Sequence, residues 1–179
     1  MTNFKNRMFR AAKLDAQLYE EVEADKSAMP QAMTVVVLSS VAGGIGSIGM
    51  GVGGPGGIVM GIIVSLGGWY IWAYLTYFIG TKFLPEPQTK ADHGELLRTI
   101  GFSSSPGLIR VLAIIPGLRG IIFLAASIWM LVAMVIAVRQ ALDYESTWRA
   151  VGVCVIGWIV QTLILVLLFS FFGGAVKPA

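Results

Sequence analysis

The chain has 179 residues, of which 56% are hydrophobic and only 13% are charged, and its mean hydropathy is +0.77. Soluble domains carry about a quarter charged residues, so this composition excludes an ordinary soluble globular domain. The apolar residues are gathered in long runs, and about 20 of them in a helix cross the hydrocarbon core of a bilayer. The sequence therefore predicts an all-α integral membrane protein.

The first segment, residues 1–30, is a charged arm with helical periodicity. Its apolar side chains fall on one face of the expected helix at Phe4, Met8, Leu18 and Val22. Such a stripe must be buried against something, and the acidic second half of the arm favours a protein surface over anionic lipid. We therefore expect an N-terminal amphipathic cytosolic helix that docks on a partner. A solvated helix packed on the protein's own loops fits the same pattern equally well.

The first predicted span, residues 31–50, ends in the letters G-x-G-x-x-G, from Gly44 to Gly49. A dinucleotide site with this fingerprint also needs a helix after it and an acidic residue about 20 positions further on. The next acidic residue is Glu86, and residues 58–64 are apolar without an amphipathic pattern. The glycines therefore do not indicate a nucleotide site.

A row of glycines spaced four apart continues into the second predicted span, residues 57–80, at Gly49, Gly53, Gly57 and Gly61. Small residues at this spacing let membrane helices approach closely, and Pro55 interrupts a continuous helix. We therefore expect a hairpin whose two helices pack closely along this row. The functional alternative is a gap that admits lipid or opens on demand.

Two further charge-free runs predict spans at residues 121–138 and 151–172, before a short tail at 173–179. A fifth segment, 98–118, is weaker because it contains prolines and Arg110. Charged residues inside a membrane usually pair or snorkel. A snorkelling side chain is the simplest interpretation of Arg110, while contact with a lipid phosphate, a partner carboxylate or a substrate path would be functional.

The positive charges give the orientation of the chain. If the fifth segment spans, one side of the membrane holds Lys5, Arg7, Arg10, Lys13, Lys26, Lys82, Lys90, Arg98, Arg139 and Arg149, and the other holds only Arg119 and Lys177. If the segment is re-entrant, Arg119 and Lys177 move to the first side while Arg139 and Arg149 leave it, and the charge bias is the same. The positive-inside rule therefore places the N-terminus in the cytosol in both cases, and length favours five spans over four.

Catalytic and metal-binding patterns are missing from the sequence. The single histidine, His93, lies in a loop, the single cysteine, Cys154, lies in the last apolar run, and the acidic residues all lie outside the apolar runs. A zinc site needs three or four ligands, and ion-coupled transporters normally carry acids inside their spans. We therefore expect no enzyme, no cofactor, no metal and no nucleic-acid partner.

Several segments of the chain resemble the Yip family of membrane proteins, which interact with Rab-type GTPases, and in particular its bacterial branch. The resemblance rests on "LYEEVEADKSAMPQAMTVVVLSS" at 18–40, "YFIGTKFL" at 77–84, "GELLRTIGFSSSPGLIRVLAIIP" at 94–116 and "VRQALDYESTWRAV" at 138–151. The family implies a cytosolic N-terminal region followed by five membrane helices. Eukaryotic members are implicated in vesicle traffic, a pathway that bacteria lack, so that role does not follow from the fold.

Two functions are compatible with these observations. The first is a non-enzymatic scaffold that organises the bacterial inner membrane, or an accessory subunit of a larger membrane complex, with the lipid bilayer and other membrane proteins or further copies of itself as partners. The second is a transporter or channel for a small solute or lipid, which would use the glycine-rich hairpin and Arg110.

Overall fold

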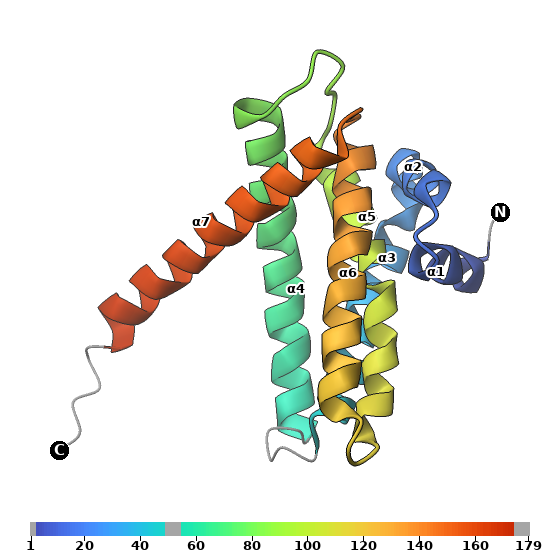
Figure 1. Ribbon diagram of the computed structural model, residues 1–179, viewed down its shortest axis with the longest axis vertical. Coiled ribbons are helices and arrows are strands. Elements are labelled where there is room, and N and C mark those ends of the chain that lie inside the picture. The colour runs from blue at the N-terminus through green and yellow to red at the C-terminus, as the bar shows by residue number, and fades with distance from the viewer. Residues whose placement is uncertain (1–2, 49–54, 174–179) are drawn as a thin grey trace.

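The computed structural model of the protein describes residues 3–48 and 55–173, and these residues form helices without any strand (Figure 1). In chain order the elements are α1 (Phe4–Ala12), α2 (Ala16–Ala24), the short 3-10 helix η1 (Lys26–Ala28), α3 (Met29–Gly46), α4 (Pro55–Phe78), its π-helical extension η3 (Ile79–Phe83), α5 (His93–Ser103), the 3-10 helix η4 (Ser105–Ile114), α6 (Arg119–Ala141) and α7 (Thr147–Gly173).

Four helical segments in the described part of the chain are long and apolar enough to cross a membrane. They are Lys26–Gly46, Pro55–Phe83, Arg119–Ala141 and Thr147–Ile164. The spans predicted at 31–50, 57–80, 121–138 and 151–172 correspond to these four segments, although each boundary shifts by several residues. Length and hydropathy are properties of the local sequence, and this is why the sequence alone predicts these helices well.

The fifth predicted span, 98–118, is not one continuous α-helix. It is divided between α5 and η4, which follow each other with a break at Ser104. A capping box between Asp92 and Glu95 starts α5, and Pro106 at the beginning of η4 cannot donate the backbone hydrogen bond that would continue the α-helix. Both pieces pack between α3 and α6, and the number of spans remains a prediction.

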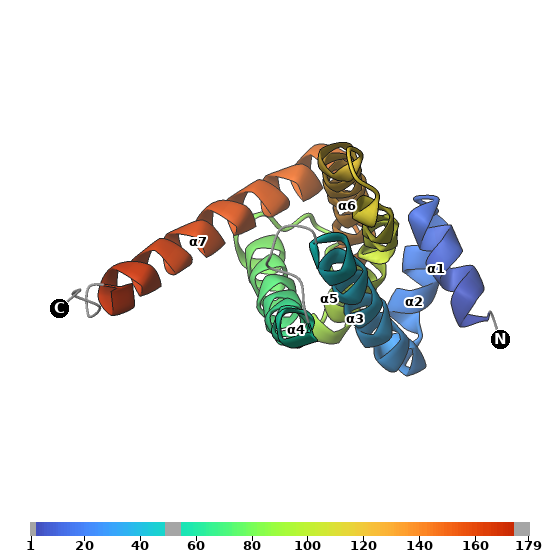
Figure 2. The same ribbon diagram turned by 90° about the horizontal axis from the view of Figure 1, so that it is seen from below.

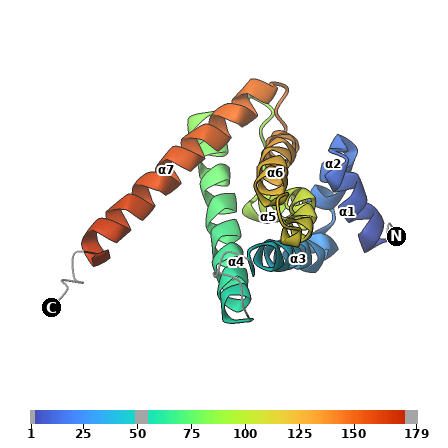
Figure 3. The same cartoon turned by 60° about the horizontal axis from the view of Figure 1, so that its bottom comes forward.

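The helices α3, α4, α5, η4 and α6 form a bundle, and α7 does not stay within it. The helix α7 begins beside the end of α6, crosses α4 and then runs away from the other helices (Figures 1 and 3). Seen from below, α3 has α4 on one side and η4 with α6 on the other. The helices α1 and α2 lie against the outer edge of the bundle (Figure 2). The distal part of α7 is therefore the one helical segment that stands apart from this bundle among the described residues.

The N-terminal arm is two helices and not the single amphipathic helix expected from the sequence. The break falls at Leu14, whose φ of 63° lies in the left-handed region, and the side chain of Asp15 then accepts a hydrogen bond from the backbone N–H of Gln17 to cap α2. A capping aspartate is a strong signal for a helix start. Asp15, which interrupts the apolar stripe, therefore marks a boundary between two helices.

Candidate functional site: a polar cavity at mid-depth in the bundle

A cavity of about 360 Å³ lies between the helices of the bundle and under the crossing of α7. Its lining is mixed, with apolar and polar side chains from α3, α4, α5, η4, α6 and α7. The polar residues on its wall are Ser39, Ser40, Ser65, Ser103, Ser104, Arg110 and Gln161. Polar residues at membrane depth are costly and usually functional, so this cavity is the candidate site.

Arg110 is the one charged residue on the wall of this cavity. Its guanidinium donates a hydrogen bond from Nη2 to the Sδ atom of Met130 over 2.8 Å, although a thioether is only a weak acceptor. Its Nε atom is buried and has no hydrogen-bond partner. Met130 is the central residue of α6, so the guanidinium lies beside the middle of this helix and points away from its ends. The snorkelling orientation expected from the sequence is therefore not the one observed.

Trp72 on α4 is the second group on the cavity wall with an unused donor. Its indole Nε1 atom is buried and has no hydrogen-bond partner. The guanidinium of arginine and the indole N–H of tryptophan can donate hydrogen bonds but cannot accept them. Two residues on the cavity wall therefore carry an N–H without a partner, and a ligand that binds either of them must carry acceptor atoms.

A second, almost entirely apolar cavity of about 580 Å³ adjoins the first one. It is a groove between α6 and α7, and it shares Trp72, Met134 and Trp158 with the polar cavity. Its remaining lining residues are Leu131, Val132, Val135, Ile136, Thr147, Val151, Cys154 and Val155. A ligand that enters the polar cavity therefore meets an apolar surface directly beside it.

Glycines bring η4 close to its neighbours and so place Arg110. A Cβ at Gly46 of α3 would overlap the backbone oxygen of Arg110, and a Cβ at Gly107 of η4 would lie 2.8 Å from the Sδ atom of Met130. The Arg110 side chain runs past Gly43, where a Cβ would lie 3.6 Å from its Cδ atom. These contacts are between α3, η4 and α6, and not along the glycine row predicted for the hairpin.

Close packing along the predicted glycine row stays a prediction, because only part of the row lies within the described residues. Gly49 and Gly53 lie outside the described residues, and Gly57 is exposed. A Cβ at Gly61 would have no atom within 4 Å. Spacing shows that glycines share a face of a helix, but it does not show what that face meets. A packing role for Gly61 would therefore need a neighbour outside the described residues of this chain.

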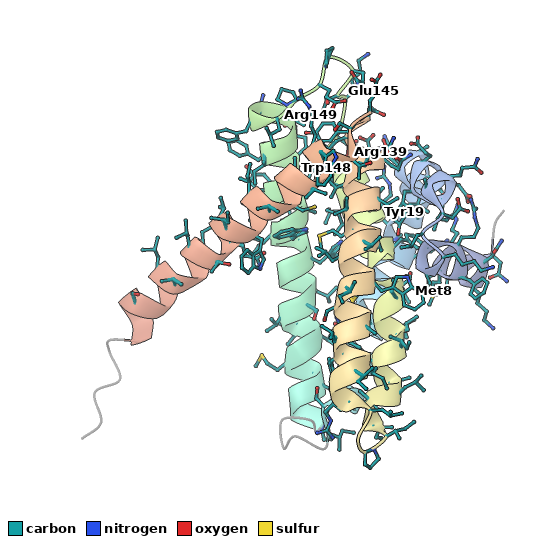
Figure 4. The ribbon with its side chains drawn as sticks, in the orientation of Figure 1. Met8, Tyr19, Arg139, Glu145, Trp148 and Arg149 are labelled. Carbon is teal, nitrogen blue, oxygen red and sulfur yellow. The ribbon has the colours of Figure 1, made fainter. Side chains whose placement is uncertain are left out.

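The apolar stripe of the arm is covered by the protein's own bundle. Leu18 and Val22 are fully buried in a cluster that also contains Val35 of α3 and Phe102 of α5, and Phe4 and Met8 pack partly buried against it. Met8 and Tyr19 lie between the arm and the bundle in Figure 4. The stripe is therefore not available to a partner in this arrangement, in contrast to the docking role predicted for it.

Ion pairs hold the two arm helices together. Arg7 is nearly buried and pairs with Glu21 and Asp25 over 2.9 and 2.8 Å, and Arg10 pairs with Asp15 and Glu21 over 2.7 and 2.6 Å. Hydrogen bonds from Ser27 and Arg7 hold the pKa of Asp25 below its usual range. The basic first half and the acidic second half of the arm, which the sequence shows as separate surfaces, thus neutralise each other.

Arg98 of α5 fastens the C-terminal end of α2 to the bundle. Its buried guanidinium donates hydrogen bonds to the backbone oxygens of Val22, over 2.9 Å, and Glu23. Cationic side chains at a helix C-terminus satisfy the last carbonyls of the helix. This contact leaves the Glu23 carboxyl partly buried, and burial raises its pKa to about 8, with further contributions from the nearby acids Glu20, Glu95 and Asp143.

We expect docking of the arm to weaken as the pH rises toward 8. A released Glu23 would titrate near its ordinary value of 4.5, so between that value and about 8 the docked state binds the extra proton and loses stability with increasing pH. The equilibrium constant for docking of the arm falls by at most about tenfold per pH unit, and it stops falling above the raised pKa of Glu23. Protease cleavage of the arm, compared at pH 6 and pH 8, measures it.

The control for this experiment is Glu23→Gln, which cannot ionise. Comparing the variant with the wild type at each pH cancels the pH dependence of the protease itself. If the ratio of the two cleavage rates is the same at pH 6 and pH 8, Glu23 does not govern docking of the arm.

Sequence reasoning found Arg110 but missed the groups around it. Ser39, Trp72 and Gln161 come from three different helices, and each alone is unremarkable in a membrane sequence. A usable signal was present, because Ser39, Ser65 and Gln161 all lie near the middle of their helices. Polar residues at equal depth in several spans can indicate a shared cavity.

The long apolar helices define an integral membrane protein, and the polar cavity lies between these helices. The chain matches the Yip1 domain over residues 16–169, so it belongs to the Yip1 domain family, as the resemblance of its segments predicted. Comparison with curated proteins and with solved structures gives no match.

Proposed function

We propose that the protein is a non-enzymatic scaffold or accessory subunit of a larger membrane complex in the bacterial inner membrane. The observation that carries this proposal is the course of α7, which leaves its own bundle (Figure 1). Its side chains beyond the crossing are exposed, among them Leu163 and Leu167, both at 57%. Membrane helices associate mainly through packing contacts, and α7 leaves many of these contacts to another protein.

Five membrane spans with a cytosolic N-terminus are part of this proposal. The elements α5 and η4 lie end to end beside α3 and α6, which supports a crossing by the two together. The family pattern and the distribution of lysines and arginines support the same topology. The bacterial location rests on the resemblance of the segments to the bacterial branch of the family.

We expect the C-terminus to lie on the face of the membrane opposite to the cytosol. Alkaline phosphatase is active only outside the cytoplasm, so a fusion to the end of the chain should be active. A fusion after Glu86, in the loop between η3 and α5, should be inactive and serves as the matched control. An inactive C-terminal fusion that still inserts would contradict five spans in favour of a re-entrant segment.

Purification in mild detergent followed by quantitative mass spectrometry tests the scaffold role. We expect a partner protein to co-purify in fixed stoichiometry. The amount of this partner recovered with the protein should fall at least severalfold when Ile159 and Leu163 of α7 are both replaced by alanine. The control replaces Ile121 and Leu124 on α6, which are exposed at 68% and 64%, against 48% and 57% for Ile159 and Leu163. The absence of any stoichiometric partner in the wild type would contradict the proposal.

A second candidate function is transport of a small solute or lipid through the cavity around Arg110. Transporters hold their substrates near the midplane of the bilayer, and Arg110 reaches the central residue of α6. Uptake of small anions into proteoliposomes, lost in Arg110→Met, would support this function. A homo-oligomer without other proteins in the purification would favour it over the scaffold.

A further inference from the structure

We propose that Arg110 forms an ion pair with an acidic side chain on a membrane helix of a different protein, which inserts that side chain into the polar cavity. This inference rests on the proposed role as an accessory subunit, and it names the chemistry by which the partner is recognised. It assigns the cavity, which the fold places at mid-depth, as the binding site for one carboxylate.

The first step of the argument is the set of unused donors. Arg110 makes no ion pair within the described residues, and its Nε atom and the Nε1 atom of Trp72 are both buried without a hydrogen-bond partner. A charged group that is partly removed from water and has no ion-pair partner is unfavourable. A carboxylate accepts hydrogen bonds from the guanidinium and neutralises its charge, and its second oxygen remains free to accept from Trp72 on the same cavity wall.

The second step concerns the source of the carboxylate. Every acidic side chain of this protein lies outside the apolar runs, so none of them is at the depth of Arg110. A second copy of the chain has the same sequence and therefore the same limitation. The acidic side chain must then come from a protein with a different sequence.

The third step concerns depth, which decides between a protein and a lipid. The hydrocarbon core is about 30 Å thick, so lipid phosphates lie roughly 15 Å from the midplane. The guanidinium of Arg110 contacts Met130, the central residue of α6. A membrane helix can carry an acidic side chain at any depth, whereas a lipid would have to draw its headgroup into the hydrocarbon.

The apolar groove between α6 and α7 supplies the remaining contact surface. It adjoins the cavity through Trp72, Met134 and Trp158, and it is lined almost entirely by apolar atoms. Apolar side chains that neighbour the acid on the partner helix can pack there. A helix that is apolar except for one central acidic residue therefore matches both parts of the site.

The test uses a synthetic membrane peptide as a probe, because the natural partner is not identified. The peptide is a helix of leucine and alanine, about 20 residues long so that it spans the bilayer, with one glutamate at its centre. A matched peptide carries glutamine at the same position. Binding to the full-length protein is measured by energy transfer between fluorophores in vesicles of zwitterionic lipid.

We expect the glutamate peptide to bind the wild-type protein about tenfold more tightly than the glutamine peptide, since polar contacts between membrane helices reach this range. Arg110→Met should abolish the preference. Trp72→Phe, which removes only the second donor and keeps an aromatic ring, should reduce it severalfold. Arg119→Met, which removes an arginine outside the cavity, should leave it unchanged.

Two outcomes would overturn the proposal. Equal binding of the two peptides to the wild type would mean that the cavity does not recognise a carboxylate. Loss of the preference for the glutamate peptide when phosphatidylglycerol is included in the same vesicles would assign the site to a lipid phosphate instead. Either result leaves the purification experiment on α7 standing, so failure of this inference is distinguishable from failure of the scaffold role.

Discussion

Leucine at Gly101 is expected to destroy the helix bundle, whereas leucine at Gly61 leaves it intact. Gly101 lies on α5 where this helix touches α3. A Cβ at Gly101 would lie 2.7 Å from the Cβ atom of Ala32 and 3.2 Å from two of its backbone atoms. Because the obstacle includes the backbone of a long helix and not only a flexible side chain, it cannot move aside locally.

The size of the effect follows from the cost of overpacking. Extra methylene groups in a well-packed core destabilise by about 1–3 kcal/mol, and occasionally by more. Leucine adds four carbon atoms at a contact that has no room for the first of them. We therefore expect Gly101→Leu to lower the free energy of unfolding by roughly 3 kcal/mol or more, and Gly101→Ala to have a smaller effect of the same sign.

Gly61 is the matched control because it is also a glycine in a membrane helix. A Cβ there would have no atom within 4 Å, so leucine would point into open space or lipid. The readouts are the yield of monodisperse protein in detergent and its thermal unfolding. Equal yields for the two leucine variants would mean that α3 and α5 do not pack as closely as described.

The helices themselves were predictable from the sequence, but their contacts were not. The long apolar runs around Val36, Ile63, Met130 and Val155 indicate spans because hydropathy is a local property. The glycine row was assigned to close packing, yet the tight positions are isolated glycines such as Gly101. A periodic pattern identifies one face of a helix, whereas a close contact depends on a neighbour that is distant in sequence.

The candidate site was predictable only in part, for the same reason. Arg110 stands out because a charge inside an apolar segment is rare. Trp72 does not, since tryptophan carries no signal until α4 and α7 are placed on either side of the cavity. The unused donor at Trp72 is a property of the folded bundle, and no residue type or spacing records it.

Alanine at both Leu18 and Val22 is expected to release the arm from the bundle while the protein still inserts into the membrane. The two side chains are fully buried together with Phe102 and Val35. Loss of a buried leucine costs about 2–5 kcal/mol in cores of this kind. The membrane spans begin after the arm and keep their apolar length, so insertion does not depend on these two residues.

Hydrogen exchange of the α1 and α2 backbone in detergent measures the release, and membrane fractionation measures insertion. Phe9→Ala is the control, because Phe9 belongs to the same arm but is 61% exposed and should change stability by less than about 0.5 kcal/mol. If exchange in the double variant remains as slow as in the wild type, the ion pairs of Arg7 and the contact of Arg98 with α2 are sufficient to hold the arm. If exchange becomes fast while the protein stays in the membrane fraction, apolar burial is what fastens the arm, and the stripe seen in the sequence has its own bundle as its partner.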